Sequence, residues 1–201
     1  MNILFSIPID NKGADDALVS YTHHRLLTIP DSALLGKKRP FFITDFAARC
    51  EARIHLAVRV CRLGRSIDKR FAHRYYDAVA VAVHFTPHPF LERLQAEGAP
   101  WSMAYGFDSS LAMGDWCSFP TGECPDTVRL DLLCNGSLAA DLNLEGVRGQ
   151  VDDLLSDASQ FYTLRQGDIF LLAGSAPHEV HIDDHLDARL DGATGIAFNV
   201  K

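Results

Sequence analysis

The stretch CEARIHLAVRV, residues Cys50–Val60, constrains the fold more than any other part of the chain. Its even positions are all apolar from position 54 onward, whereas its odd positions include Glu51, Arg53 and His55. Strict alternation is typical of a half-buried β-strand, because successive side chains point to opposite faces of a sheet. We therefore expect one face of this strand in a core. The polar face is either solvated or the wall of a site.

A second alternating stretch, AVAVAVHF at Ala78–Phe85, follows shortly afterwards. Valines and a phenylalanine form one face of this predicted strand, and alanines leading to His84 form the other. The small side chains beside His84 leave room for another group above that face.

The remaining patterns predict several helices and closing strands around these two strands. Asn135-Gly136 separates two apolar stretches and is a strong β-hairpin signal. Apolar spacing, caps and prolines predict helices at Ser66–Tyr76 with Ser66 as N-cap, at Phe90–Glu97 before Gly98, and at 149–164. Further strands are expected at 167–174, 179–192 and 194–201. With no repeat or linker, we predict a single α+β domain over residues 1–201, with a mixed, mostly antiparallel sheet.

Composition excludes several classes of function. The net charge is −7, and the short GKKRP sequence at Gly36–Pro40 is the largest basic cluster, so neither nucleic acid nor an anionic membrane is an expected partner. No stretch has the length of a membrane span, and the N-terminal apolar run is too short for a secretion signal. The five cysteines lack C-x-x-C spacing. We expect reduced thiols and a cytoplasmic location.

Several stretches taken together resemble a known family. IPDSALLGKKRPFFITDF, FAHRYYDAVAVAVHFT, LQAEGAPWSMAYGFDSSLAMGDW and CNGSLAADLNL are similar, in this order, to landmarks of short members of the fumarylacetoacetate hydrolase family. The resemblance covers about Pro30–Asp115 and continues more loosely to the C-terminus. It implies a mixed sheet rolled around a central cleft, a homodimer, a bound magnesium or manganese ion, and reactions of small 2-oxo acids.

The same resemblance implies which positions form the family's metal site, and here its residues are replaced. Two glutamate ligands of the family correspond to Arg53 and His55, and its aspartate ligand corresponds to His84. Glu51 stands at the position of the aspartate that opens the family's strand motif, and Tyr105 replaces a lysine. The resemblance therefore points to a family site whose metal-binding chemistry is lost.

The replacements suggest a different use of the site. Magnesium prefers oxygen ligands, whereas the guanidinium of Arg53 is permanently cationic, so we expect neither magnesium nor manganese as a cofactor here. Arg53 can instead hold a small carboxylate in a bidentate grip, with His55 and His84 donating to it or moving protons. Glu51 and Tyr105 complete the candidate anion site, and no catalytic residue is assigned.

Three hypotheses follow. The leading one is a pseudoenzyme or small 2-oxo-acid-binding protein; the second is an active hydrolase or isomerase of acylpyruvate-type acids with a rebuilt site. The third is an interaction subunit that pairs with an active paralogue. His178, His181 and His185 also attract notice, but alternation with aspartates favours a solvated acidic edge over a metal site.

Overall fold

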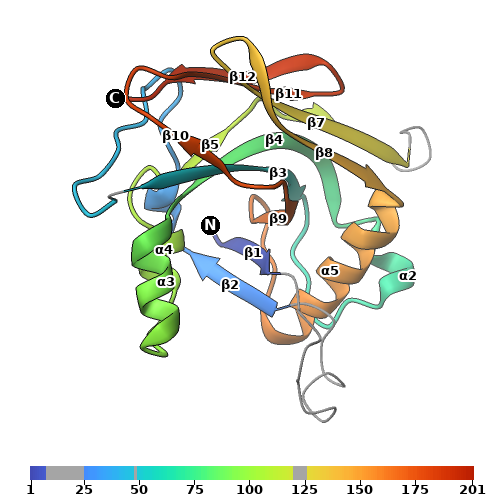
Figure 1. Ribbon diagram of the computed structural model, residues 1–201. Helices are drawn as coiled ribbons and strands as arrows, with labels where there is room; N and C mark the ends of the chain where they lie inside the picture. The colour runs from blue at the N-terminus through green and yellow to red at the C-terminus, as the bar shows by residue number, and fades with distance from the viewer. Residues whose placement is uncertain (8–24, 48, 120–125) are drawn as a thin grey trace.

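The computed structural model describes residues 1–7, 25–47, 49–119 and 126–201 (Figure 1). Eight strands form one sheet, in the order β2-β1-β9-β3-β4-β5, with β10 paired to β3 and β6 paired to β4. These strands are β1 (Ile3–Ile7), β2 (Arg25–Ile29), β3 (Cys50–Val60), β4 (Tyr76–Pro87), β5 (Leu111–Met113), β6 (Cys117–Ser118), β9 (Ile169–Gly174) and β10 (His178–Val180).

A four-stranded antiparallel sheet lies over β3 and β4, at the top of Figure 1. It consists of β7 (Thr127–Cys134), β8 (Ser137–Glu145), β11 (His185–Leu190) and β12 (Ala193–Asn199). Around the sheets lie η1 (Asp31–Ala33), α2 (Lys69–Ala72), α3 (His88–Ala96), α4 (Ser102–Tyr105) and α5 (Val147–Phe161). The predicted α+β class with mostly antiparallel pairing is confirmed.

The largest core fills the space between the two sheets. The even-numbered side chains of β3 and the valines of β4 are buried there, against Leu130 and Leu132 of β7. Phe41 stacks on Phe85 in the same core, with ring centroids 3.6 Å apart. The alternation in β3 and β4 thus correctly predicted which face of each strand is buried in the main core.

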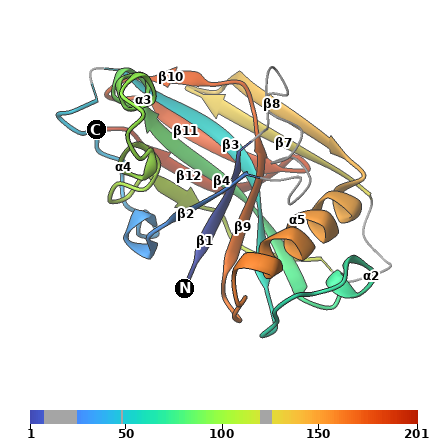
Figure 2. The same cartoon turned by 90° about the horizontal axis from the view of Figure 1, so that it is seen from below.

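The opposite face of β3 and β4 carries a second, smaller core. Ala57 of β3 and Ala80 and Ala82 of β4 pack there against Ile3 and Phe5 of β1. β1 reaches this position because it pairs in parallel with β9, which itself lies beside β3; Figure 2 shows β1 and β9 side by side. The space predicted above the alanines is therefore occupied by apolar side chains of the same chain.

Two predicted turns have the expected backbone. Asn135 and Gly136 have φ values of 52° and 83° and join β7 to β8, as a type I′ hairpin turn requires. Gly98 follows α3 in the left-handed region, with φ 64°.

The helix predicted over Ser66–Tyr76 is wrong in its bounds and in its cap. The helix α2 spans only Lys69–Ala72, and its N-cap is Asp68, whose carboxylate accepts a hydrogen bond from the Arg70 amide. Ser66 has φ 51°, and its amide donates to the Ser159 carbonyl of α5. These contacts with α5 hold the chain before Asp68 in a non-helical path.

Among the described residues, the helices are too short or too polar to cross a membrane.

Candidate functional site

The pairing of β3 with β4 sets Arg53 directly opposite His84, on the face that carries the second core. His55 lies two residues further along β3, on the same face, and Gly174 of β9 is its partner on the other side. Directly opposite residues of an antiparallel pair have Cβ atoms about 5 Å apart, and residues i and i+2 on a strand are about 7 Å apart. The structure thus brings Arg53, His55 and His84 together on one face of the β3–β4 pair. We call this group of three residues the Arg53 wall.

His55 is buried beneath a glycine. Its exposed fraction is 2%, and its Nδ1 donates to the Leu172 carbonyl over 2.8 Å. Gly174 lies so close that a Cβ added there would collide with the imidazole Cε1 and lie 2.9 Å from Nε2. Burial, followed by the neighbouring His84 and Arg53, lowers the pKa of His55 to about 3 despite the bond to Leu172. The ring is therefore neutral near pH 7.

His84 is completely buried as well. Its Nε2 donates to the Tyr105 carbonyl over 2.7 Å, and its ring stacks on the Tyr105 ring with 5.4 Å between centroids. Burial is the main cause that lowers the pKa of His84 to about 4, and Arg53 contributes in the same direction. This imidazole is also neutral near pH 7.

Phe5 of β1 lies among these rings. Its centroid is 4.8 Å from that of His55, 5.0 Å from that of His84 and 5.3 Å from that of Tyr105. The phenyl ring contributes no hydrogen-bond donor. The Nε2 of His55 and the Nδ1 of His84 are buried and have no hydrogen-bond partner among the described residues. A hydrophobic side chain thus covers two polar groups.

Arg53 is half-buried, and its Nη1 donates to the Ser175 carbonyl over 3.1 Å. It forms no ion pair with any residue that the structure describes. Glu51, which we expect in the candidate anion site, instead lies 3.3 Å from Arg49 and 3.9 Å from His88. Arg49 and His88 lie near the ends of β3 and β4, where they draw the Glu51 carboxylate away from the guanidinium.

These residues do not fit the metal that the family resemblance implies. Magnesium and manganese prefer carboxylate, carbonyl and water oxygens. The positions that would supply carboxylates hold one guanidinium and two imidazoles. Within the described ranges, no three His, Cys, Asp or Glu side chains are grouped as a metal ion would need. The guanidinium of Arg53 instead gives these positions a permanent positive charge.

Of the other singled-out histidines, His181 and His185 lie outside this group, and His178 lies beside β3. His181 is 3.6 Å from Glu179 and 3.8 Å from Asp184, with 70% of its side chain exposed. His185 bonds through Nδ1 to Asn199. His178 begins β10 and pairs with Ala52 in register. The family resemblance also implies an N-terminal acid/base segment, which is not recognisable in IPIDNKGADDALV at Ile7–Val19; this segment lies almost entirely in residues 8–24, outside the described part of the chain.

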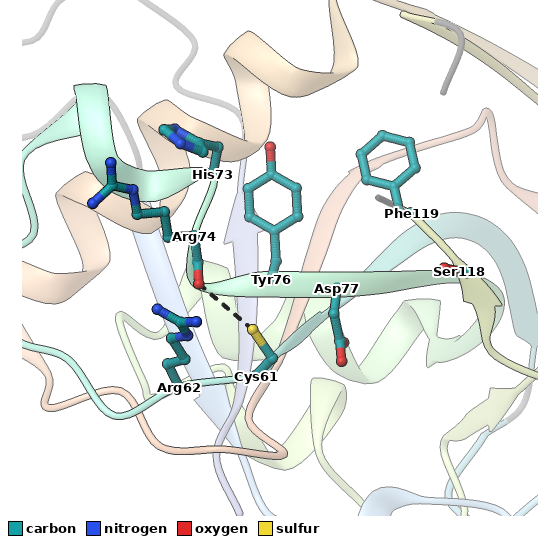
Figure 3. A pocket seen from close by; sticks show the side chains of 8 residues that line it. All are labelled: Cys61, Arg62, His73, Arg74, Tyr76, Asp77, Ser118 and Phe119. Atoms are coloured by element: carbon teal, nitrogen blue, oxygen red, sulfur yellow. Dashed lines mark hydrogen bonds between the residues drawn. The ribbon is translucent and has the colours of Figure 1, made fainter. Parts of the chain in front are cut away.

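A concavity of about 580 Å³ lies at the other end of β4 (Figure 3). In it the Cys61 thiol donates to the Arg74 carbonyl over 3.7 Å, and burial raises the pKa of this thiol. Eight residues from Tyr76 to His84 correspond to about 27 Å of strand, so this concavity is separate from the Arg53 wall. The residues lining it are Cys61, Arg62, His73, Arg74, Tyr76, Asp77, Ser118 and Phe119.

Sequence reasoning missed three contributors to the wall. Phe5 covers it, Gly174 fits against the imidazole of His55, and Ser175 orients Arg53. The alanine face of β4 was a signal that a bulky group would pack there, and the apolar stretch ILFSI at Ile3–Ile7 could have supplied one. The pairing of β1 with β9 is not visible in either segment alone.

Comparisons with known proteins agree on one family. The sequence profile described as "Fumarylacetoacetate (FAA) hydrolase C-terminal" matches residues 16–197. Oxaloacetate tautomerase FAHD1, mitochondrial, of Mus musculus is 24% identical over 175 residues, covering 86% of this chain and 78% of the relative. Oxaloacetate tautomerase fahd-1, mitochondrial, of Caenorhabditis elegans is 26% identical over 151 residues, covering 74% and 70% respectively.

Solved structures show the same fold. Fumarylpyruvate hydrolase from Pseudomonas aeruginosa, in complex with Mn²⁺ and pyruvate, superimposes with a TM-score of 0.84 at 17% identity and covers 100% of this chain and 89% of that one. A fumarylacetoacetate hydrolase family protein from Yersinia pestis has a TM-score of 0.80 at 23% identity, with 100% and 92% covered. At these identities the likeness establishes the fold and not the reaction.

Proposed function

The chain belongs to the fumarylacetoacetate hydrolase family, and from this premise we propose that it binds a small carboxylate of the size of a 2-oxo acid without metal-dependent hydrolysis. The guanidinium of Arg53 is the observation that carries the proposal. It is half-buried on the β3–β4 wall, and no described carboxylate neutralises it. A cation in partly desolvated surroundings favours an anion beside it, and a guanidinium matches a carboxylate with two parallel hydrogen bonds.

The neighbouring imidazoles support an anion site in a different way. Because His55 and His84 are neutral, they leave Arg53 as the cation of the wall. The Ser175 carbonyl uses one of the five N–H groups of the guanidinium and fixes its orientation. The remaining N–H groups are enough for bidentate binding of one carboxylate.

The names of the relatives support a ligand of this size. Oxaloacetate and pyruvate, which appear in those names, are both small 2-oxo acids. We therefore use pyruvate as the first probe. We also propose a homodimer and a cytoplasmic location; the names of several relatives include the word mitochondrial.

Calorimetric titration of the protein with pyruvate tests this function. Arg53→Ala should weaken binding by at least about tenfold, because a hydrogen bond to a charged group contributes about 1.5–3 kcal/mol. Arg59→Ala is a matched control: Arg59 lies on the same strand but is held by Asp77 through bonds of 2.9 and 3.0 Å. It should bind pyruvate like the parent protein. Equal affinity of the parent and Arg53→Ala would contradict the proposal.

Turnover measurements separate binding from the enzymatic alternative. Hydrolysis of an acylpyruvate should stay at background with magnesium or manganese added, because the family's ligand positions hold no carboxylate. Metal-stimulated turnover that His55→Ala abolishes would establish a rebuilt hydrolase or isomerase instead. If the purified chain binds no carboxylate but co-purifies with an active family member, the interaction-subunit hypothesis replaces both.

A further inference from the structure

We propose that the Arg53 wall selects 2-hydroxy carboxylates over 2-oxo carboxylates, an inference that rests on the carboxylate-binding function proposed above. It is carried by two buried nitrogens, the Nε2 of His55 and the Nδ1 of His84, which have no hydrogen-bond partner in the part of the chain that the structure describes. Both belong to side chains that are at least nine-tenths buried, and both lie on the same wall as Arg53.

The hydrogen bonds of the two rings determine what these nitrogens offer. A neutral imidazole has one N–H and one lone pair. His55 must place its N–H on Nδ1, because the Leu172 carbonyl can only accept. His84 must place its N–H on Nε2 for the same reason, since it bonds to the Tyr105 carbonyl. The tautomers follow from these bonds, and both unpartnered nitrogens are therefore acceptors.

An acceptor pair beside a guanidinium defines the complementary ligand. The guanidinium donates to a carboxylate, and either imidazole nitrogen can accept a hydrogen bond from a single ligand hydroxyl. A 2-hydroxy acid carries a hydroxyl proton next to its carboxylate, whereas a 2-oxo acid presents only oxygen lone pairs there. A ketone oxygen would leave the nitrogens without a donor and place lone pairs against lone pairs. An unsatisfied buried acceptor is unfavourable, so the hydroxyl is preferred.

Phe5 determines how a ligand reaches these nitrogens. Both atoms are sealed from solvent, and the Phe5 ring is in contact with both imidazoles. A ligand hydroxyl can therefore reach them only when this ring moves aside. Phe5→Ala should tighten binding of a 2-hydroxy acid more than binding of a carboxylate that lacks the hydroxyl.

The test compares ligands that differ at one position. Calorimetry with the parent protein uses pyruvate, L-lactate, D-lactate and propionate. We expect the better lactate enantiomer to bind about tenfold more tightly than pyruvate, which corresponds to ~1.4 kcal/mol. His84→Phe keeps a ring against Tyr105 but removes the acceptor, and it should reduce this preference. His181→Phe makes the same change at an exposed position and should retain it.

Nitrogen NMR of the histidine rings gives a second readout that needs no variant. Lactate should shift the lone-pair nitrogen of His55 or His84, and propionate should leave both unchanged. Pyruvate binding as tightly as lactate, with both nitrogens unchanged, would overturn the selectivity and leave carboxylate binding intact. Failure of all four ligands to bind would overturn the proposed function and this inference together.

Discussion

Acid should destabilise this protein through the two buried histidines of the wall. Each has a folded pKa below the ordinary value of 6.5, at about 3 for His55 and about 4 for His84. The unfolded chain therefore binds these protons first as the pH falls. Their contribution to stability is complete above pH 6.5 and is lost progressively as the pH falls from 6.5 towards 4 and 3.

The size of the effect follows from these values. Within that window each histidine reduces the free energy of unfolding by about 1.4 kcal/mol per pH unit. Between pH 7 and pH 5 each loses about 2 kcal/mol, so the pair loses about 4 kcal/mol. That is a large part of the roughly 5–15 kcal/mol by which a domain is stable.

Urea unfolding at pH 7 and pH 5 measures the loss directly. His84→Phe should lose about 2 kcal/mol less than the parent between the two pH values, because one of the two groups no longer titrates. Its ring can still stack on Tyr105, whose carbonyl keeps the Ser110 hydroxyl as a donor at 3.2 Å. His181→Phe should behave like the parent, since His181 is exposed. Equal losses in the parent and in His84→Phe would refute the reasoning.

Three further outcomes are expected. The triple variant Arg53→Glu, His55→Glu and His84→Asp should restore three carboxylates and bind magnesium, as measured by calorimetric titration. A folded triple variant that gives no heat of magnesium binding would show that the wall no longer has the geometry of the family's metal site. Gly174→Ala should lower the free energy of unfolding in urea by about 1–3 kcal/mol, because the added methyl group meets the imidazole of His55. The control Gly149→Ala in α5 places its methyl group in open space and should be neutral or stabilising. Sedimentation at micromolar concentration should show a homodimer, and a monomer would contradict that expectation.

The strands that build the wall could be predicted because the alternation of apolar and polar residues lies within each segment. Alternation alone placed Ile54, Leu56 and Val58 in the main core and set His55 on the opposite face. The Asn135-Gly136 turn was equally local, since its positive φ values suit these two residue types.

The covering of the wall could not be predicted because it depends on contacts between distant segments. The odd face of β3 looked half solvated, yet Ala57 and His55 are buried beneath β1. The partner of Glu51 was also set by tertiary structure, since Arg49 and His88 meet only after β3 and β4 pair. Ser66 shows the same limit: its contact with α5 overrides its propensity to cap a helix.

The parallel pairing of β1 with β9 has a consequence for the order of synthesis. The amide of Asn2 donates to the Asp168 carboxylate over 2.7 Å, across a sequence separation of 166 residues. At about 5–20 residues per second, a ribosome needs roughly 10–30 s to make the intervening chain. During that interval β1 can pair with β2, and β3 with β4, but β9, the strand that joins these two pairs, has not been made. Phe5 is thus placed against β3 and β4 late, and a nascent chain exposes its arginine and histidines until the β9 segment emerges.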